Sequence, residues 1–311
     1  MKDSIFLREV GLRDGLQLVK THLSTEIKLA WISEQSKAGF GEIEVTSFVP
    51  QKLLPQFSDA EELMVASNNL PNLRASALVL NVKGAIRALE CGTKKVTFVL
   101  SASEMHNKSN VKCSTDDSLA MFFDILNLVK EKKYNVEIAG AIATSFGCSI
   151  QGDVSERRVI DLAGKMLAAG ASEIILADTV GYANPMQVKH LFSMLNSIIG
   201  KRHVAAHFHD TRGMGLANVV AAIDEGVRRF DSALGGLGGC PFAPGASGNI
   251  ATEDCAYLLE SMGFSTNVDF AKLLLLRKKL SSWLPNEKLE GRLGAARPAI
   301  NFPTELISPL I

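Results

Sequence analysis

The chain has 311 residues, of which 47% are hydrophobic and 21% charged, and this balance is typical of a globular protein with a large core. Its 33 basic and 33 acidic side chains cancel, which argues against a nucleic-acid or membrane-surface partner, because both usually require an excess of Lys and Arg. We therefore expect chemistry on a small molecule.

Eight short apolar or β-branched segments alternate with longer segments of helical spacing, and this alternation indicates a parallel α/β fold. The predicted strands cover residues 4–10, 42–48, 74–80, 95–101, 136–143, 173–178, 203–209 and 229–234. The predicted helices include residues 25–38, 115–132, 155–169, 185–199 and 215–226. Pro185 suits a first helical turn, and Gly39, Gly170 and Gly226 suit helix ends.

Eight such units predict a (β/α)8 TIM barrel that forms one catalytic domain over residues 1–263. An open doubly wound sheet is the alternative, but the first strand-to-helix turn, EVGLRDG, has no G-x-G-x-x-G. Residues 264–311 contain one predicted helix, 269–282, and an irregular tail. We expect this small C-terminal helical appendage to cap the barrel or to contribute to a homodimer or higher homo-oligomer.

Cysteine usage and the first residues favour a cytoplasmic location. The chain leads directly into its first strand without the charged and apolar regions of a secretory signal. The apolar runs are strand-sized, so no membrane span is predicted. The five cysteines are odd in number and form no C-x-x-C pair, which suits a reducing compartment better than a disulfide framework.

Polar residues gather at the ends of the predicted strands, where a TIM barrel places its catalytic groups. They are Arg13 and Asp14 after the first strand, Glu44 on the second, Asp178 and Thr179 at the sixth, and His207 and His209 on the seventh. Side chains two apart in a strand point to the same side. Both histidines of HFHDT are therefore predicted to face the barrel mouth, while Phe208 points toward the helices.

The two histidines could form a hydrogen-bonded polar cluster or bind a metal. Asp14 offers a carboxylate oxygen, and Asn249, after the eighth strand, offers an amide oxygen. Two nitrogens and two oxygens without thiolates suit a divalent metal such as Mg²⁺ or Mn²⁺ in octahedral geometry better than structural zinc. Two coordination positions would remain for a substrate.

The other polar residues each allow a structural and a functional interpretation. Arg13 and Glu44 could form a structural ion pair, or Arg13 could stabilise a developing enolate oxygen. Asp178 or Thr179 could brace the barrel mouth or take part in catalysis. The loop GGLGGCPFAPGASG could be a simple connection, a phosphate cradle, or a mobile flap on which Cys240 delivers a proton.

Taken together, these segments resemble the 3-hydroxy-3-methylglutaryl-CoA lyase family, within the TIM-barrel lyases and synthases that include isopropylmalate and homocitrate synthases. The resemblance covers most of the chain. It rests on REVGLRDGLQ, IEVTSFVPQKLLPQ, NKSNVKCS, LADTVGY, HFHDT and GLGGCPFAPGASGNIATED. The last segment separates the lyases from the synthases.

The resemblance implies a divalent-metal-dependent cleavage of 3-hydroxy-3-methylglutaryl-CoA to acetyl-CoA and acetoacetate. It also implies a role for each matching residue: Asp14, His207, His209 and Asn249 as metal ligands, Asp14 or His207 as proton acceptor, Arg13 as enolate stabiliser, Cys240 as proton donor and Glu44 as support. An acyl-CoA thioester is the implied partner.

Three departures from the family pattern are visible, and the last of them leaves the identity of the acyl group open. Leu12 replaces a common Pro, Arg212 follows HDT where animal enzymes have Tyr, and Ala139 and Ala141 stand where they have an Arg and a Tyr. If the two alanines face inward, Arg212 is the nearest remaining partner in sequence for a substrate carboxylate. The alternatives are therefore a lyase on a related thioester such as citramalyl-CoA, a Claisen-type condensing synthase, or a catalytically silent binding barrel.

Overall fold

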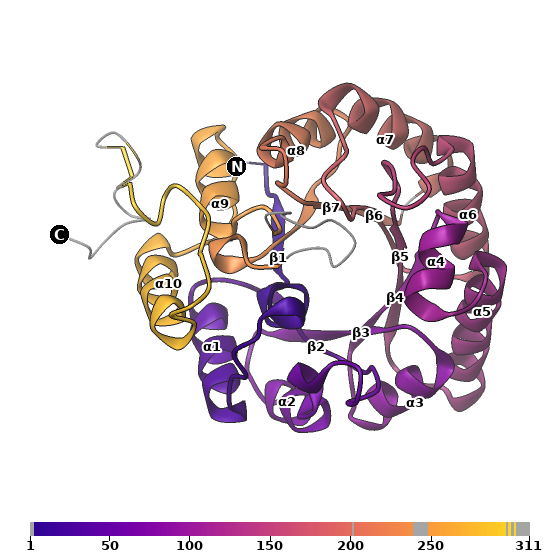
Figure 1. Cartoon of the computed structure of the whole chain (residues 1–311), viewed down its shortest axis with the longest axis horizontal. Helices are drawn as coiled ribbons and strands as arrows, with labels where there is room; N and C mark the ends of the chain where they lie inside the picture. The colour runs from indigo at the N-terminus through magenta and orange to yellow at the C-terminus, as the bar shows by residue number, and fades with distance from the viewer. Residues whose placement is uncertain (1–2, 201, 239–247, 297, 300–301, 303–311) are drawn as a thin grey trace.

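The computed structural model describes residues 3–200, 202–238, 248–296, 298–299 and 302, and it confirms the predicted barrel (Figure 1). Eight parallel strands close in chain order, with β8 paired to β1. The strands are β1 (Phe6–Glu9), β2 (Glu42–Ser47), β3 (Arg74–Val79), β4 (Lys95–Ser101), β5 (Glu137–Ala143), β6 (Glu173–Asp178), β7 (His203–Phe208) and β8 (Arg229–Ser232). Each overlaps its predicted segment, with shifts of up to two residues at the ends.

Helices form a ring outside the strands (Figure 1). They are α1 (Thr25–Lys37), α2 (Ala60–Ser67), α3 (Val82–Glu90), α4 (Glu104–Val111), α5 (Thr115–Lys132), α6 (Glu156–Ala169), α7 (Pro185–Ile199), α8 (Gly215–Asp224), α9 (Thr252–Ser261) and α10 (Phe270–Trp283). Local chemistry fixes several starts. Ser114 forms a capping box with Asp117 at α5, and at the start of α7 the side chain of Asn184 accepts from the two backbone amides that follow Pro185.

The barrel interior changes character along its axis. Toward the N-terminal ends of the strands it contains a buried ionic layer in which Arg8 and Lys95 contact Glu42 and Glu173 at 2.8–3.1 Å. Above it lies a small apolar layer formed by Val99, Ala139, Ala141, Ile175 and Ala205. The polar side chains of the mouth follow, and Asp231 links them to the ionic layer, because it contacts both Arg8 and His207.

Helix α10, in the described part of the C-terminal segment, lies outside the barrel wall (Figure 1). Helix α10 packs against α1 and α9 (Figure 1). Arg277 of α10 donates to Glu253 of α9 at 2.5 Å, and the other oxygen of Glu253 accepts from the Gly235 amide at 2.9 Å. These bonds tie the appendage to the loop after β8. Its division from the barrel at residue 263 stays a prediction. Among the described residues, no helix is long and apolar enough to cross a membrane.

Candidate active site

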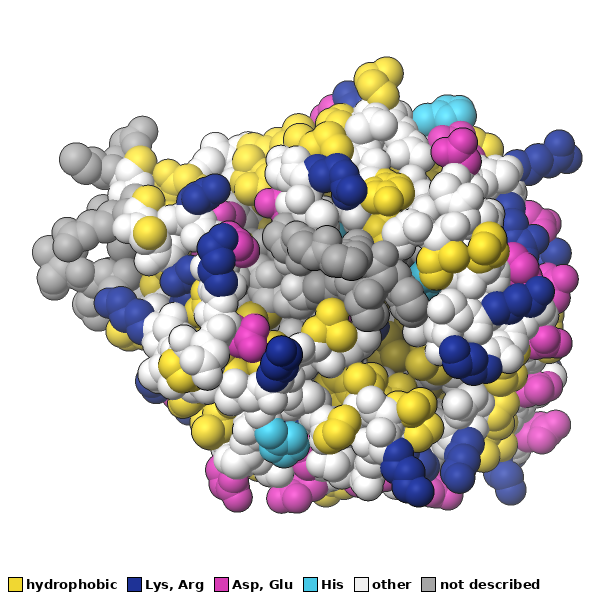
Figure 2. Space-filling model, in the orientation of Figure 1, with side chains coloured by type: hydrophobic (Ala, Val, Ile, Leu, Met, Phe, Trp, Pro, Cys, Tyr) yellow, Lys and Arg dark blue, Asp and Glu magenta, His cyan; other side chains and the backbone are white. Residues whose placement is uncertain are grey.

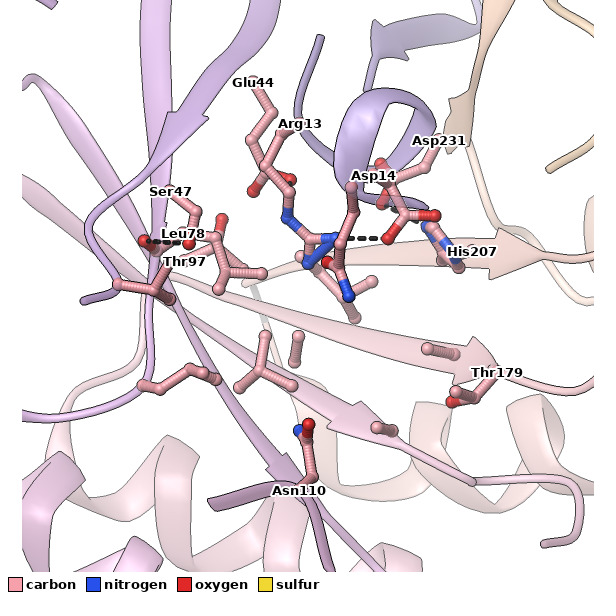
Figure 3. A pocket seen from close by; sticks show the side chains of 18 of the residues that line it. Arg13, Asp14, Glu44, Ser47, Leu78, Thr97, Asn110, Thr179, His207 and Asp231 are labelled. Atoms are coloured by element: carbon pink, nitrogen blue, oxygen red, sulfur yellow. Dashed lines mark hydrogen bonds and ion pairs between the residues drawn. The ribbon is translucent and has the colours of Figure 1, made fainter. Parts of the chain in front are cut away.

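A cavity of about 170 Å³ opens at the C-terminal mouth of the barrel. Its charged half comes from β1, β2, β7 and β8 and carries Arg13, Asp14, Glu44, His207, His209 and Asp231. The opposite half is mainly aliphatic. Figure 3 shows Arg13, Asp14, His207 and Asp231 gathered on one side, with Thr97 and Asn110 across the cavity. On the outer face, hydrophobic side chains border the central hollow (Figure 2).

A tight turn after β1 places Arg13 and Asp14 in the cavity. Residues Gly11–Gly15 form a single π-helical turn, in which the Asp14 amide donates to the Val10 carbonyl at 2.7 Å. Gly11 is required here because an added Cβ would lie 2.5 Å from the Glu9 carboxylate. That carboxylate accepts from the amides of Gly11 and Leu234, each at 2.9 Å. The turn is thereby joined to the loop after β8.

Arg13 lies between two carboxylates. Its Nη1 contacts the Asp14 carboxylate, and its Nε lies 3.1 Å from Oε2 of Glu44. The structure thus confirms the ion pair between Arg13 and Glu44 and places both residues on the cavity wall. Burial raises the pKa of Glu44, and the attraction of Arg13 and Arg8 opposes that shift.

His207, near the end of β7, and His209, just after it, face the same cavity, as predicted, with ring centroids 5.2 Å apart. His207 Nδ1 lies 3.2 Å from Asp231, and His209 Nε2 lies 3.5 Å from Asp14. Phe208 points the other way and packs against Phe146, with the two ring centroids 5.9 Å apart. One ligand atom each from Asp14, His207 and His209 lies within 4.8 Å of the others, so these three residues could hold a metal ion.

Two buried polar atoms bear on whether a metal ion would fit this cluster. Within the described part of the chain, Nδ1 of His209 and Oδ1 of Asn249 have no hydrogen-bond partner, although such groups are normally paired. The Asn249 amide donates to Asp14 at 2.7 Å and to the Leu237 carbonyl at 3.0 Å. Gly238 allows this approach, because a Cβ there would lie 2.6 Å from the Asn249 nitrogen. The donor set therefore fits a divalent cation.

The acidic and basic groups of the cluster stabilise one another's charged forms. Burial opposes ionisation of Asp14, but Arg13 and the two histidines outweigh it and lower the pKa of this carboxyl well below its usual range. Burial also disfavours the charged form of His207, yet the bond to Asp231 and the charge of Asp14 raise its pKa. Asp14 is thus a carboxylate at neutral pH, as a metal ligand must be.

Sequence reasoning missed Asp231 and its partner Arg8. Asp231 accepts from Arg8 Nε at 2.7 Å with one oxygen and faces His207 with the other. Asp231 therefore orients the His207 ring through Nδ1, so the other ring nitrogen, Nε2, is not used in this contact. The sequence could have pointed to Asp231, because the two-residue period of a strand places Arg229 and Asp231 on the same side of β8. Arg8 lies on the neighbouring strand β1 but 223 residues away along the chain, so its pairing with Asp231 could not be read from the sequence.

Asp178 and Thr179, the predicted residues at the end of β6, accept hydrogen bonds from backbone amides. Asp178 accepts from the amides of Tyr182 and Ala183 at 2.8 and 3.1 Å, which is the bracing role. Thr179 lines the cavity and accepts from the Thr144 amide at 2.8 Å.

Arg212 does not serve the acyl pocket as the sequence suggested. Its guanidinium donates to the carbonyls of Val180 and Gly181 at 3.1 and 3.0 Å and lies over the Tyr182 ring. It is not among the described residues that line the cavity. Cys240, the predicted proton donor, and most of its loop lie outside the described residues.

Fold and site together define a TIM-barrel protein with a candidate metal centre at its mouth. Residues 4–279 match the HMGL-like family model. The chain belongs to the HMGL-like family.

Relatives and solved structures agree with this assignment. The chain is 41% identical to the hydroxymethylglutaryl-CoA lyase of Bacillus subtilis, over 92% of this chain and 96% of that protein. It is 39% identical to the mitochondrial hydroxymethylglutaryl-CoA lyase of Homo sapiens, over 86% and 81%. The structure of an HMG-CoA lyase from Acinetobacter baumannii, in complex with coenzyme A and 3-methylmalate, is similar with a TM-score of 0.91 and 41% identity, over 96% of this chain and 97% of that one.

Proposed function

We propose that this protein cleaves 3-hydroxy-3-methylglutaryl-CoA to acetyl-CoA and acetoacetate in a divalent-metal-dependent reaction. The observation that carries the proposal is the cluster of Asp14, His207 and His209, with Arg13 in contact with Asp14. The relatives compared above, at about 40% identity over most of the chain, are hydroxymethylglutaryl-CoA lyases. An acyl-CoA thioester is accordingly the proposed substrate class.

Asp14, His207, His209 and Asn249 would hold the metal. Mixed nitrogen and oxygen ligands without thiolates favour Mg²⁺ or Mn²⁺. When bound, such an ion would lower the pKa of the substrate hydroxyl and hold its oxygen in place.

The protein's own residues would carry the proton and charge transfers. Asp14 or His207 accepts the proton of the C3 hydroxyl, the C3 oxygen becomes a ketone, and the C2–C3 bond breaks. Its electron pair forms the enolate of the acetyl thioester, whose oxygen Arg13 stabilises. A proton from Cys240 then completes acetyl-CoA at C2. Glu44 holds the Arg13 guanidinium in place through their 3.1 Å ion pair.

A second candidate substrate is citramalyl-CoA, which the same steps would split into acetyl-CoA and pyruvate. One observation favours it: Ala141 lines the cavity, so strand β5 offers a methyl group at that position of the acyl site. The carboxylate of citramalyl-CoA is attached to the carbinol carbon itself. It could therefore stay beside Arg13 and needs no partner deeper in the pocket.

The test is a product balance. The purified protein is stripped with EDTA, supplied with Mg²⁺ or Mn²⁺, and incubated separately with each thioester. We expect acetyl-CoA and a keto acid in equal amounts, only in the presence of metal. Acetoacetate identifies the first substrate and pyruvate the second. Release of free CoA without a keto acid would indicate thioester hydrolysis and would contradict the proposal. A homodimer or higher homo-oligomer, and a cytoplasmic location, remain predictions.

A further inference from the structure

The half of the cavity formed by β3 to β6 is markedly apolar. Its lining there includes aliphatic side chains from all four strands and the residue after β3: Leu78, Leu80, Val99, Ala141, Ala143, Ile175 and Ala177. Among the described residues that line the cavity, Arg13 is the one Lys or Arg. Its guanidinium is already engaged by Asp14 and Glu44 on the opposite side.

Strand β5 contributes a small side chain to this half of the cavity wall. Ala141 is paired in register with Val99 on β4 and Ile175 on β6, so a small side chain lies between two larger ones on the cavity wall. Ala139 and Ala205 close the same apolar layer below. The methyl group of Ala141 leaves room on the inner face of β5 that a larger side chain would fill.

The polar groups that do reach this half are uncharged. The hydroxyl of Thr97 is buried and has no hydrogen-bond partner within the described part of the chain. His106 also lines the cavity, and burial lowers its pKa to about 4, so its ring is neutral near pH 7. A carboxylate placed here would lose its hydration without gaining a cation, which is costly. A hydrocarbon group would meet matching surroundings.

We propose that this half of the cavity, lined by Val99, Ala141 and Ile175, binds an alkyl group on C3 of the thioester that is longer than methyl. The inference rests on the proposed cleavage, and it names the substrate class of the same site. A 3-alkyl-3-hydroxyglutaryl-CoA would lose the C2–C3 bond in the same way. The hydroxyl proton leaves as the ketone forms, C2 gains one proton, and the products are acetyl-CoA and a 3-oxo acid with the longer chain.

Burial of each methylene contributes about 0.8 kcal/mol, which corresponds to about a fourfold gain in affinity. The gain should continue until the alkyl group reaches the closed layer of Ala139 and Ala205. An enzyme built for a methyl group alone would show the opposite trend, because overpacking of a filled pocket costs binding energy.

A binding measurement tests the alkyl pocket independently of the proposed catalysis. The probes are 3-alkylglutaryl-CoA thioesters that lack the hydroxyl and cannot be cleaved, with methyl, ethyl, propyl and butyl groups, and calorimetry measures Kd for the metal-loaded protein. We expect Kd to fall about fourfold with each of the first added carbons. A rise in Kd from methyl to ethyl and propyl would overturn the inference, whether or not the hydroxylated thioesters are cleaved.

Two variants locate the effect. Ala141→Phe fills the space between Val99 and Ile175, so we expect it to abolish the gain from longer alkyl groups and to weaken butyl binding by about 50-fold or more, as three lost methylenes predict. Ala168→Phe makes the same change on the exposed side of α6 and should keep the wild-type trend. An unchanged trend in Ala141→Phe would contradict the assignment of this wall. If the hydroxylated series is bound with this trend but not cleaved, the proposed function fails while the inference stands.

Discussion

Arg13 is the residue whose geometry matters most to the proposed chemistry. Its guanidinium contacts Asp14 and lies 3.1 Å from Glu44, so two carboxylates fix its plane. A lysine has the same charge, but it lacks the planar fork that can hold both carboxylates and face an enolate oxygen.

Arg13→Lys should therefore lower kcat/KM on the order of 10³-fold, as expected for loss of a preorganised oxyanion donor. Its thermal unfolding should remain close to that of the wild type. The measurement is steady-state release of acetyl-CoA at saturating metal. Turnover within a few-fold of the wild type would show that Arg13 has only a structural role.

Asp231 should control how tightly the metal binds, although it is not itself a ligand in this account. It faces Nδ1 of His207 at 3.2 Å and is held by Arg8 at 2.7 Å. Loss of such a supporting carboxylate usually weakens metal affinity 10- to 100-fold. We predict this range for Asp231→Asn, measured as the Kd for Mn²⁺ by calorimetry. Asp161→Asn, an exposed change on α6, is the control and should leave Kd unchanged.

His106 should make stability depend on pH. Burial lowers its folded-state pKa from 6.5 to about 4, so the folded protein does not take up the proton that the unfolded chain binds below pH 6.5. Its contribution is present above that pH and is lost as pH falls toward 4, by about 2 kcal/mol at pH 5.

The free energy of unfolding, measured by denaturant titration at pH 7 and pH 5, tests this. His106→Phe cannot bind a proton at this position, so we expect the variant to lose about 2 kcal/mol less than the wild type over this range. Equal losses would show that His106 ionises as freely in the folded protein as in the unfolded chain.

At the scale of the strands, the ionic layer below the cavity is the main structural feature that alternation did not reveal. Arg8 contacts Glu42 and Glu173 at 2.9 Å and Asp231 at 2.7 Å. Burial raises the pKa of Glu173, but Arg8, Lys95 and Arg229 outweigh it and lower that pKa to about 2. The three carboxylates are therefore charged and depend on their cations.

Arg8→Met should cost about 3–5 kcal/mol, because removal of one member of a buried pair leaves uncompensated charge. Lys165→Met is the control. Its ion pair with Asp161 is at least half exposed on both sides, so we expect a loss of at most about 1 kcal/mol. Equilibrium unfolding in denaturant measures both. Equal destabilisation of the two variants would contradict the importance of the buried layer.

The elements also explain which predictions succeeded. The strands and the inward histidines of β7 followed from period two and from short β-branched runs, which are local properties. The partners of Arg8 lie 34 to 223 residues away along the chain, so only closure of the barrel brings them together. The turn Gly11–Gly15 was predicted as a turn, but its π-helical form depends on contacts with Glu9 and the loop after β8.

At the scale of the molecule, the closed barrel brings residues from both ends of the chain to one mouth. Asp14 and Asn249 are 235 positions apart and share a 2.7 Å hydrogen bond. The appendage reaches the same region through Arg277, Glu253 and Gly235. The candidate metal cluster, Arg13 and the loop after β8 therefore form one unit supported by the whole fold.

We propose that the mouth of this barrel carries a metal-dependent carbon–carbon lyase. The most direct measurement compares wild type and His207→Ala at saturating Mn²⁺, following acetyl-CoA and acetoacetate released from 3-hydroxy-3-methylglutaryl-CoA. We predict equal amounts of both products from the wild type, and a loss on the order of 10³-fold or more in the variant, whose barrel should remain folded because a mouth residue adds little to the packed layers below. Equal product release by a folded His207→Ala protein would contradict the proposed role of this site.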